Sequence, residues 1–166
     1  MLIYHPAYDA YHCVFRMLAV AERVKNTEID KARLLDFYLV FPGAIEKIRL
    51  PSDMRALRQV AKDVANVYRD PVSNSSTFLE MRHIQQAALK SIAASGLIDI
   101  DRYSAGYVER TLMTLPSSVE KKLHEFLSVN SLVVDAVLNE LAKIPLLGRD
   151  GLKHRSQLME YRYDVA

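Results

Sequence analysis

The chain has 166 residues, of which 50% are apolar and 25% are charged, values that are ordinary for a globular domain. A chain of this length is expected to form one domain, residues 1–166, that buries about 70% of its unfolded surface. Its net charge of +2, from 22 basic and 20 acidic residues, is too balanced to indicate a nucleic-acid-binding protein by itself. The single cysteine, Cys13, excludes an internal disulfide framework and favours a reducing compartment.

The sequence carries no sign of export or of membrane insertion. Its N-terminus, MLIYHPAYDAY, lacks the basic region and the continuous apolar core of a signal peptide. The apolar runs LLDFYLVF and SLVVDAVL are each interrupted by an aspartate and fall short of the roughly 20 residues that span a bilayer. We therefore expect a cytoplasmic protein without a membrane partner.

The first helix is expected over residues 7–24, after a short apolar strand over residues 1–4. Pro6 suits the first turn of a helix. Within the helix, Tyr8, Tyr11 and Phe15 recur at steps of three and four residues and define one face. Arg16 falls away from this face.

The central helix is expected over residues 27–40, and it ends before Pro42-Gly43. Its sequence is apolar on nearly all sides, and such a helix cannot lie on a surface. The other elements are therefore predicted to pack around it. A short helical turn over residues 44–50 is expected to follow.

Two amphipathic helices are predicted next, over residues 53–69 and 77–94, and they complete a helical part of residues 1–95. The first of them has an apolar stripe and, on another face, a polar one. The members of this polar stripe are Arg55, Arg58, Lys62, Asn66 and Arg69.

The pattern changes at Leu97, where β-prone residues begin. We predict a β-hairpin in which residues 97–100 pair with residues 107–112. Residues 101–106, DRYSAG, have the composition of a turn. The hairpin would thus resemble the wing of a winged helix-turn-helix protein.

The rest of the part 96–166 is expected to hold helices over residues 118–128 and 131–144 and a half-buried strand over residues 159–165. The predicted fold is mainly α with a small β component (α+β). It consists of a helical domain around a central apolar helix, with a winged-helix-like hairpin.

The histidines offer no convincing metal site. Asp9 and His12 could share a helix face, with His5 nearby, but the four ligands of a structural zinc site at their usual spacing are missing. Hydrogen bonds within the domain or at an interface explain both histidines more simply. We expect no bound metal and no cofactor.

The sequence also lacks a recognisable catalytic constellation. Cys13 and His12 are adjacent and would point about 100° apart on a helix, so they do not form a nucleophile–base pair. None of the five glycines belongs to a phosphate-binding loop. We therefore predict that the protein is not an enzyme.

Basic residues gather in two segments. Residues 47–62 hold five basic side chains against one acidic, for a net +4, and residues 143–155 hold four against one, for a net +3. The polar stripe in the first segment, with Arg55, Arg58 and Lys62, could follow a phosphate backbone. A solvated helix face would show the same pattern, so the stripe leaves both interpretations open.

The winged-helix pattern supports a second hypothesis. Helix 77–94 would then recognise DNA and residues 101–106 would form the wing. This helix offers few donors to base edges, so direct reading of a base sequence is not expected. Its donors are Arg82, Gln85, Gln86 and Lys90.

Tyrosines and histidines gather near the N-terminus, in a group that we call the Tyr/His segment. Its members are Tyr4, His5, Tyr8, Tyr11 and His12. Tyrosine suits protein interfaces, because its ring is large and rigid and its hydroxyl stays hydrated. It suits the edge of a core as well, so both a partner-binding surface and internal packing remain open.

Three segments within residues 4–51, YHPAYDAYHCVFRML, IDKARLLDFYLVFP and IRLP, resemble the middle components of bacterial ABC-three-component conflict systems. The Lamassu anti-phage and anti-plasmid systems are the best known group of these. The resemblance implies a non-catalytic adapter. In such systems an SMC-like ABC ATPase senses foreign DNA or DNA ends, and a separate effector, commonly a nuclease, does the damage.

The resemblance transfers no individual site residue to this sequence. It implies that the chain docks on the SMC-like ATPase and couples sensing to effector activation in antiviral defence. We expect the Tyr/His segment and the central helix to contribute to docking. We expect Arg55, Arg58, Lys62 and Arg69 to contact DNA within the complex. The alternative is a free-standing winged-helix regulator that binds DNA alone, and a small enzyme with an unfamiliar site is a third hypothesis.

Overall fold

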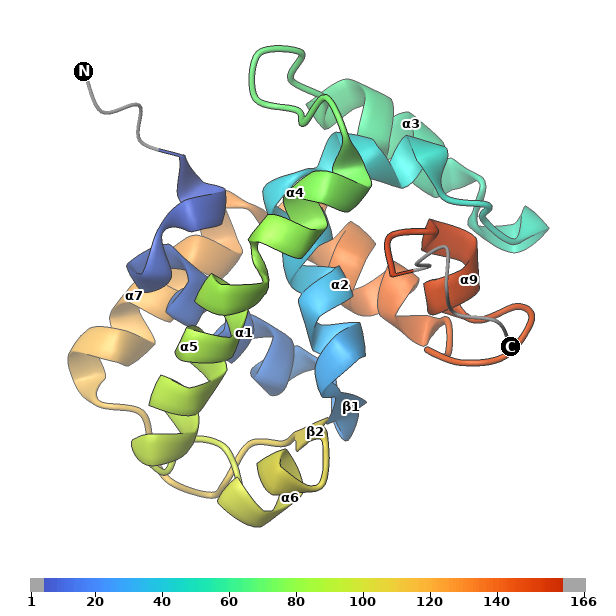
Figure 1. Cartoon of the computed structure of the whole chain (residues 1–166). Helices are drawn as coiled ribbons and strands as arrows, with labels where there is room; N and C mark the ends of the chain where they lie inside the picture. Colours follow the sequence, from blue (N-terminus) through green and yellow to red (C-terminus); the bar gives the residue numbers. More distant parts are fainter. Residues whose placement is uncertain (1–4, 160–166) are drawn as a thin grey trace.

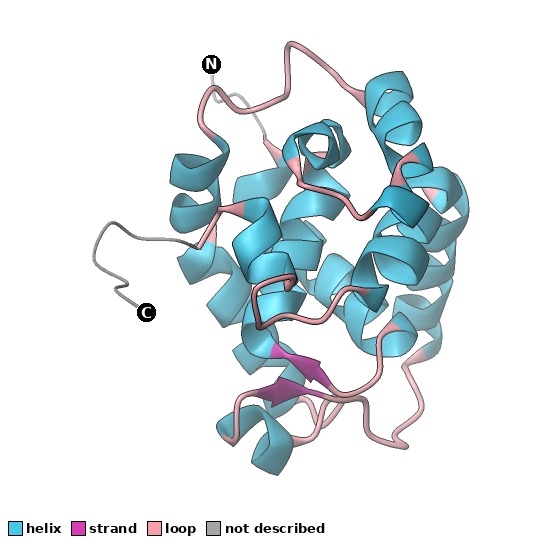
Figure 2. Cartoon of the chain, turned by 90° about the vertical axis from the view of Figure 1, so that its right-hand side faces the viewer, coloured by secondary structure: helices cyan, strands magenta, loops and turns pink. Residues whose placement is uncertain are grey.

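The computed structural model describes residues 5–159, which form a body of packed helices with a small sheet at one end (Figures 1 and 2). This confirms the predicted fold class. In chain order, the first eight elements are η1 (Pro6–Tyr8), α1 (Ala10–Arg23), β1 (Thr27–Glu28), α2 (Ile29–Val40), η2 (Pro42–Lys47), η3 (Ser52–Met54), α3 (Ala56–Val64) and α4 (Asn74–Glu80). The others are α5 (Arg82–Ala94), α6 (Ile100–Ser104), β2 (Tyr107–Val108), α7 (Ser117–Val129), α8 (Ser131–Val134), η4 (Asp135–Glu140), η5 (Leu141–Lys143) and α9 (Leu152–Ser156).

Helix α2 is the centre of the fold, as its sequence predicts. Every residue in 31–39 is buried, and the other helices surround it (Figure 1). Three aromatic rings meet the ring of Phe37 with centroid separations of 5.2 to 5.9 Å, and they belong to Tyr38, Phe41 and Phe78. Such tilted and edge-on aromatic contacts add to the stabilisation that comes from burial. Helix α1 packs against α2, α5 and α7, whereas α3 packs mainly on η2.

A buried polar cluster joins α1, α2 and α5. Asp36 of α2 has no solvent exposure, and its carboxylate accepts hydrogen bonds from Arg16 Nε at 2.5 Å and from Gln85 Nε2 at 2.9 Å. Gln85 also donates to the carbonyl oxygen of Arg33 and accepts from Arg33 Nε, both at 3.0 Å. Arg16 is therefore buried, and the prediction that it falls away from the packed face is wrong. The reason is its partner on another helix, which periodicity within one helix cannot reveal.

The electrostatics of this cluster follow from its burial. Burial by itself lowers the pKa of Arg16, but the Asp36 carboxylate outweighs it, so the net pKa lies above the ordinary value. The Cys13 sulfur lies 3.9 Å from an Asp36 carboxylate oxygen. Burial, and then this negative charge, raise the pKa of the Cys13 thiol, which stays protonated and is a poor nucleophile.

The strands do not form the predicted hairpin. Strand β1 pairs antiparallel with β2, so that Thr27 lies opposite Val108 and Glu28 lies opposite Tyr107. The predicted pairing survives as one antiparallel bridge between Ile98 and Arg110. The central helix begins at Ile29, two residues later than predicted, because the chain before it is in the sheet.

The predicted wing, residues 101–106, is mostly helical. The side chain of Asp99 accepts a hydrogen bond from Arg102 N at 2.8 Å and so caps the N-terminus of α6. This side-chain cap favours a helical turn over the open turn that the composition suggests. The chain then reverses at Gly106, whose φ of +97° suits glycine. The prediction of a winged-helix hairpin is therefore wrong for its turn, residues 101–106.

Helix α3 ends at Val64, earlier than predicted. Asp70 Oδ2 accepts from Asn66 N at 3.1 Å, and Asn66 Oδ1 accepts from Tyr68 N, also at 3.1 Å. These local side-chain bonds replace the helical ones. Arg69 therefore leaves the predicted polar stripe and lies in a loop, residues 65–73, that we call the α3–α4 loop.

One further predicted helix is divided in the structure, and two predicted strands lie wholly or mostly outside the described residues. Predicted helix 77–94 is divided at Met81 into α4 and α5. The predicted strand over residues 1–4 lies outside the described residues, and so does the predicted strand over residues 159–165 apart from Met159.

The buried cluster predicts a large loss of stability for Asp36→Ala. Removing the carboxylate leaves the buried Arg16 charge without its partner, and such losses lower the free energy of unfolding by about 3–5 kcal/mol. The matched control is Glu140→Ala, because Glu140 pairs with Lys143 at 3.0 Å and both side chains are exposed. We expect the control to lose less than about 1 kcal/mol. Urea denaturation followed by circular dichroism measures both, and similar losses would contradict the assigned role of Asp36.

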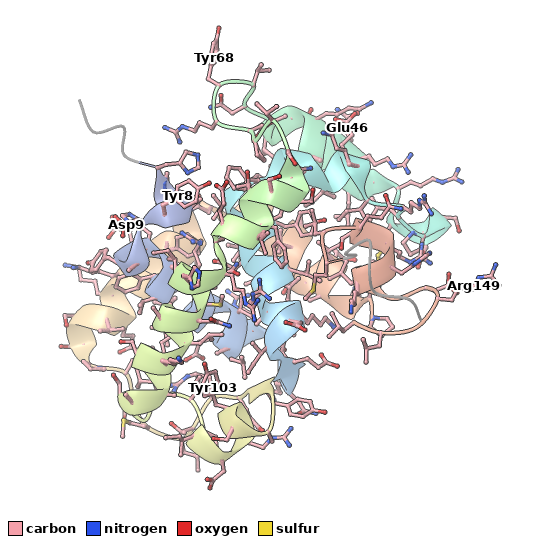
Figure 3. The ribbon with its side chains drawn as sticks, viewed as in Figure 1. Tyr8, Asp9, Glu46, Tyr68, Tyr103 and Arg149 are labelled. Carbon is pink, nitrogen blue, oxygen red and sulfur yellow. The ribbon has the colours of Figure 1, made fainter. Side chains whose placement is uncertain are left out.

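Gly43 predicts a second effect, because a Cβ at this position would lie 3.0 Å from Asp70 Oδ2 and 3.1 Å from the Cα of Ala65. We expect Gly43→Ala to push the α3–α4 loop away from η2 and to lower the free energy of unfolding by about 1 kcal/mol. Trypsin should then cleave faster after Arg69. Cleavage after Arg149, which projects from a distant part of the molecule (Figure 3), is the internal control and should keep its rate.

Candidate functional site

The Tyr/His segment is held in place by two consecutive side-chain caps. His5 Nδ1 accepts from Ala7 N at 3.2 Å at the start of η1, and Asp9 Oδ1 accepts from His12 N at 3.0 Å at the start of α1. A neutral imidazole that accepts at Nδ1 carries its proton on Nε2. These two caps fix the orientation of the segment relative to α1. Tyr8 and Asp9 lie near each other at the left of the molecule as drawn in Figure 3.

The two tyrosines of the segment make different contacts. Tyr8 is 45% exposed, and its hydroxyl donates to Glu80 of α4 at 2.7 Å. Partial burial, and then the bond to Glu80, raise the pKa of Tyr8. Tyr11 is 52% exposed, and its hydroxyl accepts from Lys122 of α7. Tyr4 lies outside the described residues.

A cleft of about 540 Å³ opens beside this segment. It lies among η1, the N-terminal half of α1, the end of α2, α7 and the α3–α4 loop. Its apolar lining consists mainly of Phe15, Leu39, Val40, Phe41, Phe126 and Val129. Its polar lining includes His5, Tyr11, His12, Arg69, Lys122 and Glu125. The structure thus brings three members of the Tyr/His segment together with residues far away in the sequence.

Aromatic contacts shape the walls of the cleft. The rings of Tyr11 and Phe15 meet edge to face at 5.0 Å, and His5 lies 5.4 Å from the ring of Phe41. The Lys122 ammonium lies at the hydroxyl end of the Tyr11 ring, so its contact with Tyr11 is a hydrogen bond at the edge of the ring. At the back, Arg16 donates to the carbonyl oxygen of Pro6 at 3.1 Å and so ties η1 to the buried cluster.

The predicted basic stripe is divided between two places. Arg55, Arg58 and Lys62 are exposed at α3, whereas Arg69 lines the cleft. The prediction that these residues share one helix face is therefore wrong for Arg69, because α3 ends before it. Sequence reasoning also missed the contribution of Lys122 and Glu125 on α7. Their spacing of three residues places them on one helix face, but nothing in the sequence indicates what that face meets.

The two basic segments of the sequence meet in space. Arg49 N donates to the Arg155 carbonyl oxygen at 3.3 Å, and Arg155 Nη1 donates to the Arg49 carbonyl oxygen at 2.5 Å. Helix α9 consequently lies beside the segment that leads into α3 (Figure 1). We call the exposed residues Lys47, Arg49, Arg55, Arg58, Lys62 and Arg149 the basic edge.

Within the described residues, the side chains that could hold a metal ion do not gather at one place. No group of three or more histidine, cysteine, aspartate or glutamate side chains in residues 5–159 could hold a metal ion. In the same residues, no helix combines the length and the apolar character that a membrane span requires. His12 Nδ1 lies 3.4 Å from Asp9 Oδ1, so these two side chains form a local contact.

Comparison with known protein families relates almost the whole sequence to one family. Residues 2–164 match the family described as ABC-three component (ABC-3C) system Middle Component 5. No curated protein and no solved structure matches the chain. The match extends well beyond residues 4–51, which contain the three segments that resemble the middle components, and it confirms that resemblance. The chain belongs to the Middle Component 5 family and has an accessory role in an ABC-three-component system.

Proposed function

We propose that the chain is a non-catalytic adapter that docks on the SMC-like ABC ATPase of its system. In this role it couples the sensing of foreign DNA or DNA ends to the activation of a nuclease or another effector, in anti-phage and anti-plasmid defence. Its membership of a middle-component family supports the existence of partner components. The protein would work in the cytoplasm, where these partners meet foreign DNA.

The observation that carries the docking role is the exposed aromatic surface beside the cleft. Tyr8 and Tyr11 are about half exposed although they belong to a segment that two caps hold in place. A rigid, half-exposed tyrosine loses little conformational entropy on binding and buries a large area, which is typical of residues that dominate interfaces. The adjoining cleft adds a concave surface for a protruding side chain of the partner.

The docking role predicts weaker recovery of the ATPase by the double variant Tyr8→Ala/Tyr11→Ala. Tagged chain would be co-expressed with the SMC-like ATPase of its system, and the complex would be isolated and quantified. Truncation of interface tyrosines commonly weakens binding by about 2 kcal/mol or more, so we expect a loss of at least tenfold in affinity.

The matched control is Tyr107→Ala, because Tyr107 lies in β2 at the opposite end of the molecule (Figure 1). It should leave recovery unchanged. Thermal denaturation of each variant checks that the fold is retained. Equal recovery with the wild-type chain and the Tyr8/Tyr11 variant would remove these residues from the interface.

DNA contact through the basic edge is a second candidate function. It is supported by the meeting of the two basic segments at Arg49 and Arg155, which gathers cations from distant parts of the chain. Such a surface could neutralise phosphates and release their counterions. The contact would occur within the complex, or by the isolated chain if the protein is a free-standing regulator.

This second function predicts that Arg55→Glu/Arg58→Glu/Lys62→Glu weakens DNA binding and reduces its dependence on salt. The control reverses three exposed basic residues elsewhere, Arg23→Glu/Lys25→Glu/Lys90→Glu, and has the same net charge. Binding to a duplex at low salt would be measured by fluorescence anisotropy for the isolated chain and for the complex. Binding by the isolated chain favours a regulator, and binding by the complex alone favours the adapter. Equal losses in both variants would exclude a specific role of the basic edge.

A further inference from the structure

The floor of the cleft is an apolar surface that stays accessible to solvent. Phe15, Val40 and Phe126 pack against the core on one side but are only partly buried, and Val129 is exposed. Transfer of such a surface from water is favourable. The volume of the cleft, about 540 Å³, lies within the usual range of ligand pockets and accommodates a few large side chains. The floor therefore favours a ligand with an apolar body.

Hydrogen-bond donors predominate at the rim of the cleft. Arg69 makes no side-chain hydrogen bond or ion pair within residues 5–159, so its guanidinium is available. Lys122 donates to Tyr11, a neutral partner that leaves its positive charge uncompensated, and the Tyr11 hydroxyl keeps its own proton to donate. The imidazole of His5 carries a proton on Nε2. The rim thus offers several donors to anionic groups of a ligand.

Few acceptors oppose these donors. Among the described residues that line the cleft, Glu125 is the only carboxylate, and the charge of Arg16 at its back is compensated by Asp36. With both histidines neutral, the charges of Arg69, Lys122 and Glu125 give the lining of the cleft a net charge of +1. A guanidinium binds a carboxylate with two parallel hydrogen bonds, and such charge-assisted bonds are among the stronger polar contacts.

We infer that the cleft binds a peptide segment of a partner component in which a carboxylate side chain stands next to a large apolar side chain. The apolar side chain fills the floor, and the carboxylate binds to Arg69 and Lys122. This inference rests on the proposed docking function and names the chemistry of its ligand. Neither part of the lining suffices alone, since the floor is neutral and the rim cations are too exposed to bind an anion strongly without it.

The position of Arg69 supports a specific site. Its loop is fixed by the Asn66 and Asp70 side chains and by the close approach of Gly43. The neighbouring Tyr68 points away from the body (Figure 3) and is 99% exposed, while Arg69 lines the cleft. The loop therefore presents the cation to the cleft and an apolar ring to the outside, where the same partner can contact it.

The chemistry is tested first with a small probe on the full-length chain. 4-Phenylbutyrate combines an aromatic body with a carboxylate, whereas 4-phenylbutanol and 4-phenylbutylamine replace the anion by a neutral or a positive group. NMR titration of the ¹⁵N-labelled protein would measure affinity and locate the shifted residues. We expect the carboxylate to bind about tenfold more tightly than the alcohol, with shifts around Tyr11 and Phe126. Equal affinity for the three probes, or shifts elsewhere only, would overturn the inference.

Matched variants separate the site from general electrostatics. Arg69→Gln should weaken carboxylate binding about tenfold, and Arg58→Gln, which removes an exposed arginine of the basic edge, should leave it unchanged. Equal weakening by both variants would overturn the inference. Displacement of the probe by single-stranded DNA in an Arg69-dependent manner would also overturn it, because the cleft would then be a nucleic-acid site.

The partner is tested with overlapping peptides that tile the ATPase and the effector of the same ABC-three-component system. Binding by peptides that combine an acidic and a large apolar residue, lost in Arg69→Glu and Lys122→Glu, supports the inference. Concentration-dependent self-association that Arg69→Glu abolishes would assign the cleft to a second copy and overturn the inference.

Isolation of the complex distinguishes failure of the proposed adapter function from failure of the inference about the cleft. If the wild-type chain recovers no ATPase, the proposed function fails. If the complex forms and neither Arg69→Glu nor Lys122→Glu weakens it, the inference about the cleft fails while the adapter role stands.

Discussion

The buried carboxylate of Asp36 determines how the three central helices are arranged. An ionised group without solvent exposure is stable only if its charge is compensated and its lone pairs are satisfied. Arg16 from α1 and Gln85 from α5 supply these bonds, so each helix has one register in which the cluster closes. Apolar packing alone would tolerate small shifts of one helix along another, whereas the hydrogen-bond geometry of this cluster does not.

The same cluster reaches the cleft. Arg16 donates to the carbonyl oxygen of Pro6, so the position of η1 depends on the charge pair in the core. The caps at His5 and Asp9 then fix the Tyr/His segment, and Lys122 connects it to α7. The wall of the cleft is therefore rigid, which suits a surface that must recognise a partner without the entropy loss of ordering itself.

The cleft and the basic edge are built from different parts of the chain and differ in character. The cleft combines aromatic walls with a few donors, whereas the basic edge consists of exposed cations from the two segments that meet at Arg49 and Arg155. A protein that connects two other components needs two such separate surfaces. This arrangement fits the accessory role that family membership establishes, and the adapter hypothesis assigns a binding function to each of the two surfaces.

Local patterns in the sequence predicted much of the helical framework. The apolar run LLDFYLVF indicated a helix that must be enclosed, and the structure buries it. Local patterns failed where a side chain competes with the backbone. The Asp99 side chain caps a helical turn where the wing was predicted. The Asn66 and Asp70 side chains bond to the backbone after Val64, so α3 ends early and Arg69 lies outside the predicted stripe. Short polar side chains favour caps and turns alike, and only the surrounding packing decides between them.

The sequence by itself determined the fold class, the central helix and the family, because these depend on periodicity and on residue order along the chain. The tertiary structure alone decided that Arg16 is buried against Asp36, that Arg69 and Lys122 share a cleft with Tyr11, and that two basic segments meet. Each of these brings together residues that are 20 or more positions apart in the sequence. Such contacts follow from how helices pack against each other, and no spacing within a single helix encodes them.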